Sequence, residues 1–261
     1  MRMLSYTLMG TGFSFLMTAA GAAVVFFFRK NKAEILEKIL LGFAAGIMIA
    51  ASFWSLLEPA IEQAQEFSLP SWVPAGVGFF IGGACFIAVD AGIAYYRKIS
   101  HDQEKPGCMK KNSLMLLLAV VLHNIPEGMA VGIAFVGAGQ EKISLSAAFA
   151  IAFGIGIQNI PEGAAVALPL RKEGMRAGRA FLYGSLSGIV EPIFGMLTLV
   201  VFSHTAKMMP WMLSFAAGAM FYVVIAELIP KARQEAERSE DIWGFLVGFL
   251  LMMILDVSLG A

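Results

Sequence analysis

The chain has 261 residues, of which 58% are hydrophobic, 19 are basic and 19 are acidic. A soluble domain of this length needs far more polar surface, so the composition excludes an ordinary water-soluble protein and indicates that lipid surrounds most of the chain. The formal net charge of zero gives no reason to expect nucleic acid or an acidic macromolecule as a partner.

Apolar runs of about 20 residues, the length that crosses a bilayer as a helix, occur eight times. They cover residues 4–28, 36–57, 72–96, 113–138, 144–170, 179–203, 209–229 and 241–260. The first run is too long for the apolar part of a signal peptide and is followed by the basic stretch "RKNK", so we expect it to remain as a helix. The sequence therefore predicts an all-α membrane protein with eight transmembrane helices in a single transmembrane domain, residues 1–261.

Lys and Arg residues are distributed unequally between the two sides of the predicted bundle. The loops after the first, third, fifth and seventh spans contain 16 of them: Arg29, Lys30, Lys32, Lys38, Arg97, Lys98, Lys105, Lys110, Lys111, Arg171, Lys172, Arg176, Arg179, Lys231, Arg233 and Arg238. The opposite side contains three: Arg2, Lys142 and Lys207. Because basic loops remain in the cytoplasm, this pattern predicts a multi-pass protein of the cell membrane with both termini extracytoplasmic.

The second and seventh spans share a short motif, "FAAGIM" at 43–48 and "FAAGAM" at 215–220. Each span is second in a group of three, and the two run in opposite directions. This indicates an inverted repeat of helices 1–3 and 6–8 around helices 4 and 5, an arrangement typical of transporters. The simpler interpretation of the motif is close packing through small residues, which many membrane helices use.

Acidic residues also occur near the ends of several spans. Glu58, Glu62 and Glu66 follow the second span on the outer side, where they either concentrate cations or only solvate a loop. Asp90 and Glu227 lie near the cytoplasmic ends of the third and seventh spans. We interpret them as a candidate exit site, with solvation or pairing with a loop lysine as the alternative.

Two nearly identical motifs lie in the middle of the fourth and fifth spans: "HNIPEG" at 123–128 and "QNIPEG" at 158–163. The sixth span adds Glu191, in "GIVEPIFG", at its own midpoint. Each charge at the bilayer centre costs about 2.5–3.5 kcal/mol on insertion scales, and no Lys or Arg occurs at that depth. A bound cation would supply the missing positive charge.

The spacing brings the polar groups of each motif to one side of its helix. His123 and Asn124 precede Glu127 by four and three residues, which is one helical turn. The fifth span repeats this geometry with Gln158, Asn159 and Glu162. Because the two spans are antiparallel, we expect Glu127 and Glu162 to face each other and to share one metal ion or bridge two.

A proline accompanies the glutamate in all three central spans: Pro126, Pro161 and Pro192. Proline lacks an N–H, so the carbonyl four residues earlier loses its helical donor. These carbonyls belong to Leu122, Ile157 and Gly188. In lipid such groups need another partner, so prolines beside carboxylates favour a path for a partly hydrated cation over a simple packing kink.

The donor types narrow the choice of ion. Oxygen ligands alone would favour Mg or Ca, whereas the imidazole of His123 and the thioether of Met48, at mid-depth in the second span, shift the preference towards Zn, Fe, Mn or Cd. Met48 is one of 16 methionines, most of which must fill the core. We therefore expect a divalent transition metal as the transported substrate and Met48 as a candidate ligand.

These motifs, within eight spans and with outside termini, resemble the ZIP (zinc/iron-regulated transporter-like) family, especially its bacterial GufA-like branch. The resemblance covers essentially the whole chain. It implies influx of divalent transition metals into the cytoplasm by a homodimer, through a two-metal site between the second, fourth, fifth and sixth spans.

By position, the resemblance implies two overlapping ligand sets. One contains Met48, His123, Glu127, Gln158 and Glu162, and the other contains Asn124, Glu127, Asn159, Glu162 and Glu191. Many family members have His in place of Gln158 and Asp in place of Asn159, so this chain has less charge and one imidazole fewer. A His-Glu pair of many relatives reads Ala226-Glu227 here, which weakens the exit site.

The sequence thus predicts a carrier whose midplane site opens alternately to each side, rather than an enzyme. We expect zinc, with iron, cadmium or manganese as further substrates, and up to two ions per protomer. Membrane lipid and a second copy of the chain are the other expected partners. An intramembrane zinc hydrolase is the alternative, but the chain has no "HExxH". A channel would differ from a carrier in lacking saturable flux.

Overall fold

The computed structural model describes residues 2–27, 33–65, 68–99, 111–202, 206–233 and 239–259. Within these ranges all regular structure is helical and no strand is present. Eight helical stretches are long and apolar enough to cross a membrane: 2–26, 38–64, 72–92, 120–139, 145–172, 177–201, 209–233 and 240–258. The predicted fold class, an all-α protein with eight membrane-spanning helices, is confirmed.

The α-helices are α1 (Arg2–Ala22), α2 (Ala33–Ala50), α3 (Glu58–Ala64), α4 (Trp72–Ile99), α5 (Lys111–Gly139), α6 (Leu145–Lys172), α7 (Ala177–Leu186), α8 (Val190–Phe202), α9 (Met209–Val223), α10 (Ile229–Arg233) and α11 (Glu240–Leu259). Three 3-10 segments join or extend them: η1 (Ala23–Phe26), η3 (Ser187–Ile189) and η4 (Ala206–Met208). Two π segments, η2 (Ala51–Leu57) and η5 (Val224–Leu228), interrupt the second and seventh spans.

The predicted second span, 36–57, ends too early. The helix continues through η2 into α3 and ends at Ala64, although Glu58 and Glu62 are charged. Apolarity marks only the part of a helix that lies in lipid, and a helix can extend beyond the bilayer into water.

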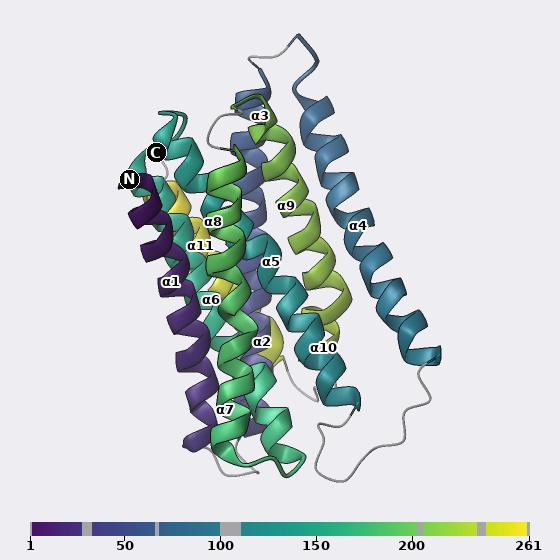
Figure 1. Ribbon diagram of the computed structural model, residues 1–261. Helices are drawn as coiled ribbons and strands as arrows, with labels where there is room; N and C mark the ends of the chain where they lie inside the picture. Colours follow the sequence, from purple (N-terminus) through teal and green to yellow (C-terminus); the bar gives the residue numbers. More distant parts are fainter. Residues whose placement is uncertain are drawn as a thin grey trace.

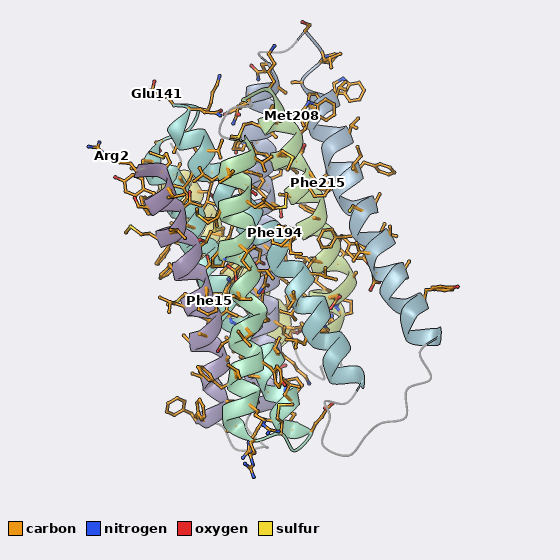
Figure 2. The ribbon with its side chains drawn as sticks, in the orientation of Figure 1. Arg2, Phe15, Glu141, Phe194, Met208 and Phe215 are labelled. Carbon is orange, nitrogen blue, oxygen red and sulfur yellow. The ribbon has the colours of Figure 1, made fainter. Side chains whose placement is uncertain are left out.

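The helices form a central group with two flanking pairs (Figure 1). α1, α5, α6 and the α7–α8 span pack against one another, while α2 packs along α11 and α4 packs along α9. Both chain termini lie at the same end of the bundle as α3 (Figure 1). Figure 2 shows Arg2, Glu141 and Met208 at this end, which we call the terminus end.

Glycines allow α2 and α11 to touch backbone to backbone. A Cβ atom added at Gly46 would collide with the carbonyl oxygen of Phe245, and one at Gly248 would collide with that of Phe43. The close contact is therefore reciprocal, with a Phe carbonyl from each helix against a Gly of the other.

The pair formed by α4 and α9 repeats this pattern. A Cβ atom added at Gly218 would collide with the carbonyl oxygen of Phe79, and one at Gly82 would collide with that of Phe215. In both pairs the Phe and Gly of the "FAAG" motif meet a Gly and a Phe three residues apart on the partner helix.

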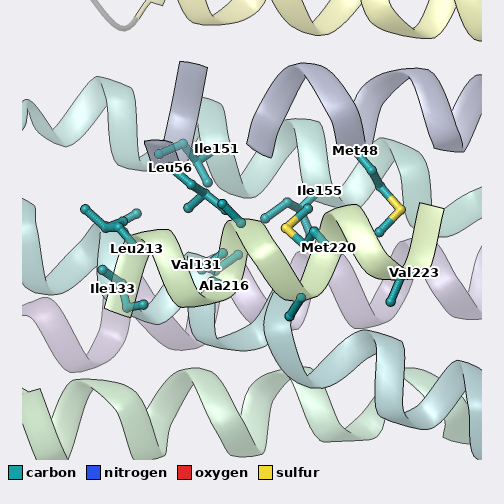
Figure 3. Close-up of a cluster of buried hydrophobic side chains, with 14 of the residues drawn as sticks. Met48, Leu56, Val131, Ile133, Ile151, Ile155, Leu213, Ala216, Met220 and Val223 are labelled. Atoms are coloured by element: carbon teal, nitrogen blue, oxygen red, sulfur yellow. The ribbon is translucent and has the colours of Figure 1, made fainter. Parts of the chain in front are cut away.

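The largest apolar core lies where α2, α5, α6 and α9 meet (Figure 3). Met48 of α2 and Met220 of α9 are both fully buried in it, and Ile155 of α6 belongs to the same cluster. By contrast, α4 and α11 expose large apolar side chains such as Phe80 and Trp243. Such surfaces suit lipid rather than water.

Candidate metal centre

The three predicted carboxylates are buried in the central group of helices. Glu127 of α5 and Glu191 of α8 have no exposed surface, and Glu162 of α6 is 4% exposed. Glu127 and Glu162 lie close enough to act on each other electrostatically. The structure thus brings together the two glutamates of the repeated motif.

Amide side chains bind two of these carboxylates. Gln158 Nε2 donates a hydrogen bond to Glu127 Oε1 at 2.6 Å. Asn159 Nδ2 donates to Glu191 Oε2 at 2.8 Å, and the Thr18 hydroxyl donates to Glu191 Oε1 at 3.3 Å. Each amide therefore accompanies a different carboxylate, and α1 contributes a hydroxyl that the sequence did not reveal.

Several oxygen atoms in this cluster have no hydrogen-bond partner in the described part of the chain. They are Asn124 Oδ1, Glu127 Oε2, Gln158 Oε1, Asn159 Oδ1 and Glu162 Oε2. A buried acceptor without a donor is unfavourable by about 1–3 kcal/mol, and more if it is charged, so five in one place require a common explanation. Carboxylate and amide oxygens are also common ligands of divalent cations.

The final glycine of each motif lets a central helix approach its neighbour. A Cβ atom added at Gly128 would clash with the backbone of Glu191, and one at Gly163 would clash with the backbone of Thr18. The motif therefore brings α5 against α8 and α6 against α1, in addition to supplying polar side chains. α5 and α6 both continue as helices through their prolines.

Asn124 faces the irregular part of the sixth span. Its Nδ2 donates a hydrogen bond to the Ser187 carbonyl at 3.1 Å, within the 3-10 segment η3 that precedes α8. This contact occupies the amide nitrogen, so the amide oxygen is the group available to a ligand.

Two predicted ligands are less clearly connected to this cluster. Met48 is buried in the apolar core, and its role as a ligand stays a prediction. The backbone of His123 belongs to α5, but its side chain lies outside the described residues. Where the chain is described, no three His, Cys, Asp or Glu side chains form a group that could hold a metal ion. A metal between these helices would therefore need the amide oxygens as well.

The candidate exit residues lie elsewhere, on α4 and η5. Tyr222 donates a hydrogen bond to Asp90 Oδ2 at 2.9 Å, and Lys231 Nζ donates to Glu227 Oε2 at 2.6 Å. Both carboxylates act electrostatically on Tyr222, so they belong to one neighbourhood. Glu227 is thus paired with a lysine, and its role in an exit site stays a prediction.

A cavity of about 580 Å³ lies at the terminus end, between the second span, α5, α6, α9 and α11. Ser55, Glu58, Glu62, Lys142 and Asp256 line it, and we call it the terminus-end vestibule. Ser55 donates a hydrogen bond to Asp256 Oδ1 at 2.6 Å, whereas Asp256 Oδ2 has no partner among the residues described. Glu66, the third acidic residue of the predicted mouth, lies outside the described ranges.

Asp256 carries no readable signal in the sequence. The one available hint is a carboxylate inside an otherwise apolar run, "FLLMMILDVSL". Its partner Ser55 is 201 residues away, so only the folded helices bring them together.

Apolar side chains separate the vestibule from the polar cluster. Along α6, Ile151 lines the vestibule, Ile155 belongs to the apolar core, and Gln158 follows within the next turn. α5 has the same order from Ala134 to Glu127. The route from the vestibule to the carboxylates is therefore closed by about one helical turn of apolar packing.

Comparisons with known proteins agree with the family resemblance of the motifs. A family model described as "ZIP Zinc transporter" matches residues 96–256. Zinc transporter ZIP11 of Xenopus tropicalis is 36% identical, over 97% of this chain and 97% of its own length.

Two bacterial proteins are similar over most of their lengths. Zinc transporter GufA of Myxococcus xanthus is 38% identical over 84% of this chain and 86% of that protein. Zinc transporter ZIPB of Bordetella bronchiseptica is 36% identical over 98% of this chain and 82% of that protein. These matches confirm the predicted family and the prediction that the chain is not an enzyme. The chain belongs to the ZIP family of transporters, and it is similar to the GufA-like bacterial branch.

Proposed function

We propose that this protein carries zinc into the cytoplasm across the cell membrane, through the polar cluster around Glu127 and Glu162. The relatives named zinc transporters support the metal. The basic loops at the end opposite the termini support the orientation. The observation that carries the proposal is the group of five buried oxygen atoms without donors, which a cation would satisfy.

Two metal ions would share this cluster. One ion would bind Glu127, Glu162 and Gln158, with His123 and Met48 as the further ligands that the resemblance implies. The other would bind the same two glutamates with the set Asn124, Asn159 and Glu191. The pairing of Gln158 with Glu127, and of Asn159 with Glu191, supports this division into two halves.

The neutral amides at Gln158 and Asn159 influence metal choice. They put neutral oxygen donors where many relatives have imidazole or carboxylate, which lowers the preference for softer ions. The general order of divalent affinities still places zinc above iron and manganese, so we expect zinc and cadmium to enter, with iron and manganese binding more weakly. The glutamates and His123 would still favour these ions over Mg, which gives up its water reluctantly.

An inverted repeat would supply the mechanism of alternating access. The reciprocal Phe–Gly contacts of α2 with α11, and of α9 with α4, support this symmetry. The contacts of Gly128 with Glu191 and of Gly163 with Thr18 extend it to the central helices. In this arrangement the central group carries the metal and moves against the flanking helices.

The apolar closure between the vestibule and the carboxylates favours a carrier over a channel. An open channel needs a continuous aqueous path, whereas a carrier closes one side before it opens the other. The terminus-end vestibule, which has three carboxylates and one lysine in its lining, would concentrate cations at the entrance of the path. We expect the protein to work as a homodimer in lipid, with Asp90 and Glu227 near the release route.

Metal uptake into proteoliposomes tests the proposal. The wild type should take up zinc and cadmium with saturable kinetics, whereas Glu162→Gln should take up neither. Glu141→Gln, in a loop at the terminus end, is the matched control and should transport like the wild type. Equal uptake by Glu162→Gln and the wild type would refute the proposed path.

A further inference from the structure

Lys231 lies in α10, towards the end of the bundle opposite the terminus-end vestibule. Its Nζ atom bonds Glu227 Oε2 at 2.6 Å, and the two side chains are 35% and 19% exposed. An ion pair on an open helix surface contributes little, because water and salt screen it. Here the glutamate is mostly buried, so the pair is much less screened.

The backbone around this pair is irregular. Glu227 belongs to the π segment η5, and Lys231 follows Pro230 in the short helix α10. Single-turn π segments inside α-helices recur at functional sites. Glu227 lies near Tyr222, which donates a hydrogen bond to Asp90.

The charge of Lys231 also acts on the metal centre. Glu162 experiences the electrostatic influence of Lys231, although Glu162 lies in the middle of α6. No Lys or Arg is fully buried among the described residues, so the three central carboxylates have no buried basic partner there. Lys231 is therefore a fixed cation within electrostatic range of that cluster and in direct contact with Glu227.

We propose that Lys231 promotes metal release, because its ammonium group competes with the outgoing metal ion for Glu227. This inference rests on the proposed function. A carboxylate on the release route would otherwise retain a divalent cation. The tethered ammonium occupies Glu227 when the metal has left and opposes rebinding from the cytoplasmic side. It acts as a fixed charge and undergoes no proton transfer.

The test compares zinc uptake into proteoliposomes that contain increasing zinc inside. Lys231→Met removes the charge and keeps a side chain of similar length, whereas Lys231→Arg keeps the charge. Arg233→Met is the matched control, because Arg233 lies on the same short helix but pairs with Asp241 at 3.5 Å. Initial uptake without internal zinc checks that each variant is folded and active.

We expect internal zinc to inhibit Lys231→Met at an about fivefold lower concentration than the wild type. Lys231→Arg and Arg233→Met should behave like the wild type. Adding Glu227→Gln to Lys231→Met should remove the increased sensitivity to internal zinc, because the carboxylate for which zinc and Lys231 compete is then absent.

Three results would contradict the inference. Equal inhibition of Lys231→Met and Arg233→Met, in protein that transports, would overturn it and leave the proposed function intact. So would increased sensitivity that persists in the Glu227→Gln double variant. Absence of zinc uptake by the wild type would instead refute the proposed function, and this inference with it.

Discussion

The amide side chains stabilise two of the three buried carboxylates. Gln158 and Asn159 each donate an N–H to a carboxylate and leave their own oxygen without a donor. An amide can thus stabilise a glutamate in the metal-free protein and also offer an oxygen to a cation. A carboxylate in the same position could only accept.

Replacing Glu162 separates metal binding from folding. Glu162→Gln removes one of two adjacent like charges, so we expect the metal-free protein to melt at the same or a higher temperature. Zinc at about 100 times its Kd should stabilise the wild type by about 2.7 kcal/mol but not the variant. Thermal unfolding in detergent with and without zinc measures both effects, and equal stabilisation of the two proteins would exclude Glu162 as a ligand.

Replacing Asn159 tests the dual role of the amide. Asn159→Asp loses the donor to Glu191 and adds a fourth carboxylate to the cluster. We expect the metal-free variant to be less stable by about 1–3 kcal/mol and zinc to stabilise it more than it stabilises the wild type. Unfolding curves at several zinc concentrations test this. A variant as stable as the wild type without metal would contradict the account.

The main elements of the candidate site were predictable from the sequence, for physical reasons. The repeated motif has one-turn spacing and lies at mid-span, so the proximity of Glu127 and Glu162 follows from helix geometry alone. Thr18 and Asp256 were not predictable, since their partners are distant in sequence and neither belongs to a motif. The π segments η2 and η5 carry no proline or glycine that would have marked them.

At the scale of the helices, the repeated motif determines packing as well as chemistry. Gly128 and Gly163 bring the backbones of α5 and α6 against those of α8 and α1. The backbone carbonyl of Glu191 or of Thr18, on the neighbouring helix, occupies the space that a Cβ atom would need. The distance between helices at the metal centre therefore depends on these two glycines.

Adding one methyl group at this contact should disturb the site. Gly163→Ala forces α6 away from Thr18, and we expect a loss of about 1–3 kcal/mol in stability together with reduced zinc affinity. Gly92→Ala, in α4, is the control, because a Cβ atom there meets open space. Thermal unfolding and zinc titration of both variants test this. The idea fails if Gly163→Ala is as stable as Gly92→Ala.

At the scale of the whole molecule, the polar groups are arranged in three places along the helix bundle. The acidic vestibule lies at the terminus end, the carboxylate and amide cluster lies in the central helices, and the pair of Glu227 and Lys231 lies towards the opposite end. Apolar packing lies between the vestibule and the cluster. The proposed carrier would therefore be closed at its terminus end in this structure.

Labelling of single cysteines tests the orientation in the membrane. In a background with Cys85→Ser and Cys108→Ser, a cysteine replacing Glu62 in the vestibule should react with an impermeant thiol reagent added outside intact cells. A cysteine replacing Arg171, in the last turn of α6 at the other end, should react only after the membrane is opened. The reverse pattern would contradict the predicted extracytoplasmic termini.

Anomalous diffraction from crystals loaded with cadmium tests the central claim most directly, because it locates the ion without assuming its ligands. We expect anomalous peaks between Glu127 and Glu162, at about 2.0–2.6 Å from their carboxylate oxygens, with the amide oxygen of Gln158 or Asn159 turned towards each ion. Peaks confined to the terminus-end vestibule, with none between the two glutamates, would exclude a metal site at the repeated motif.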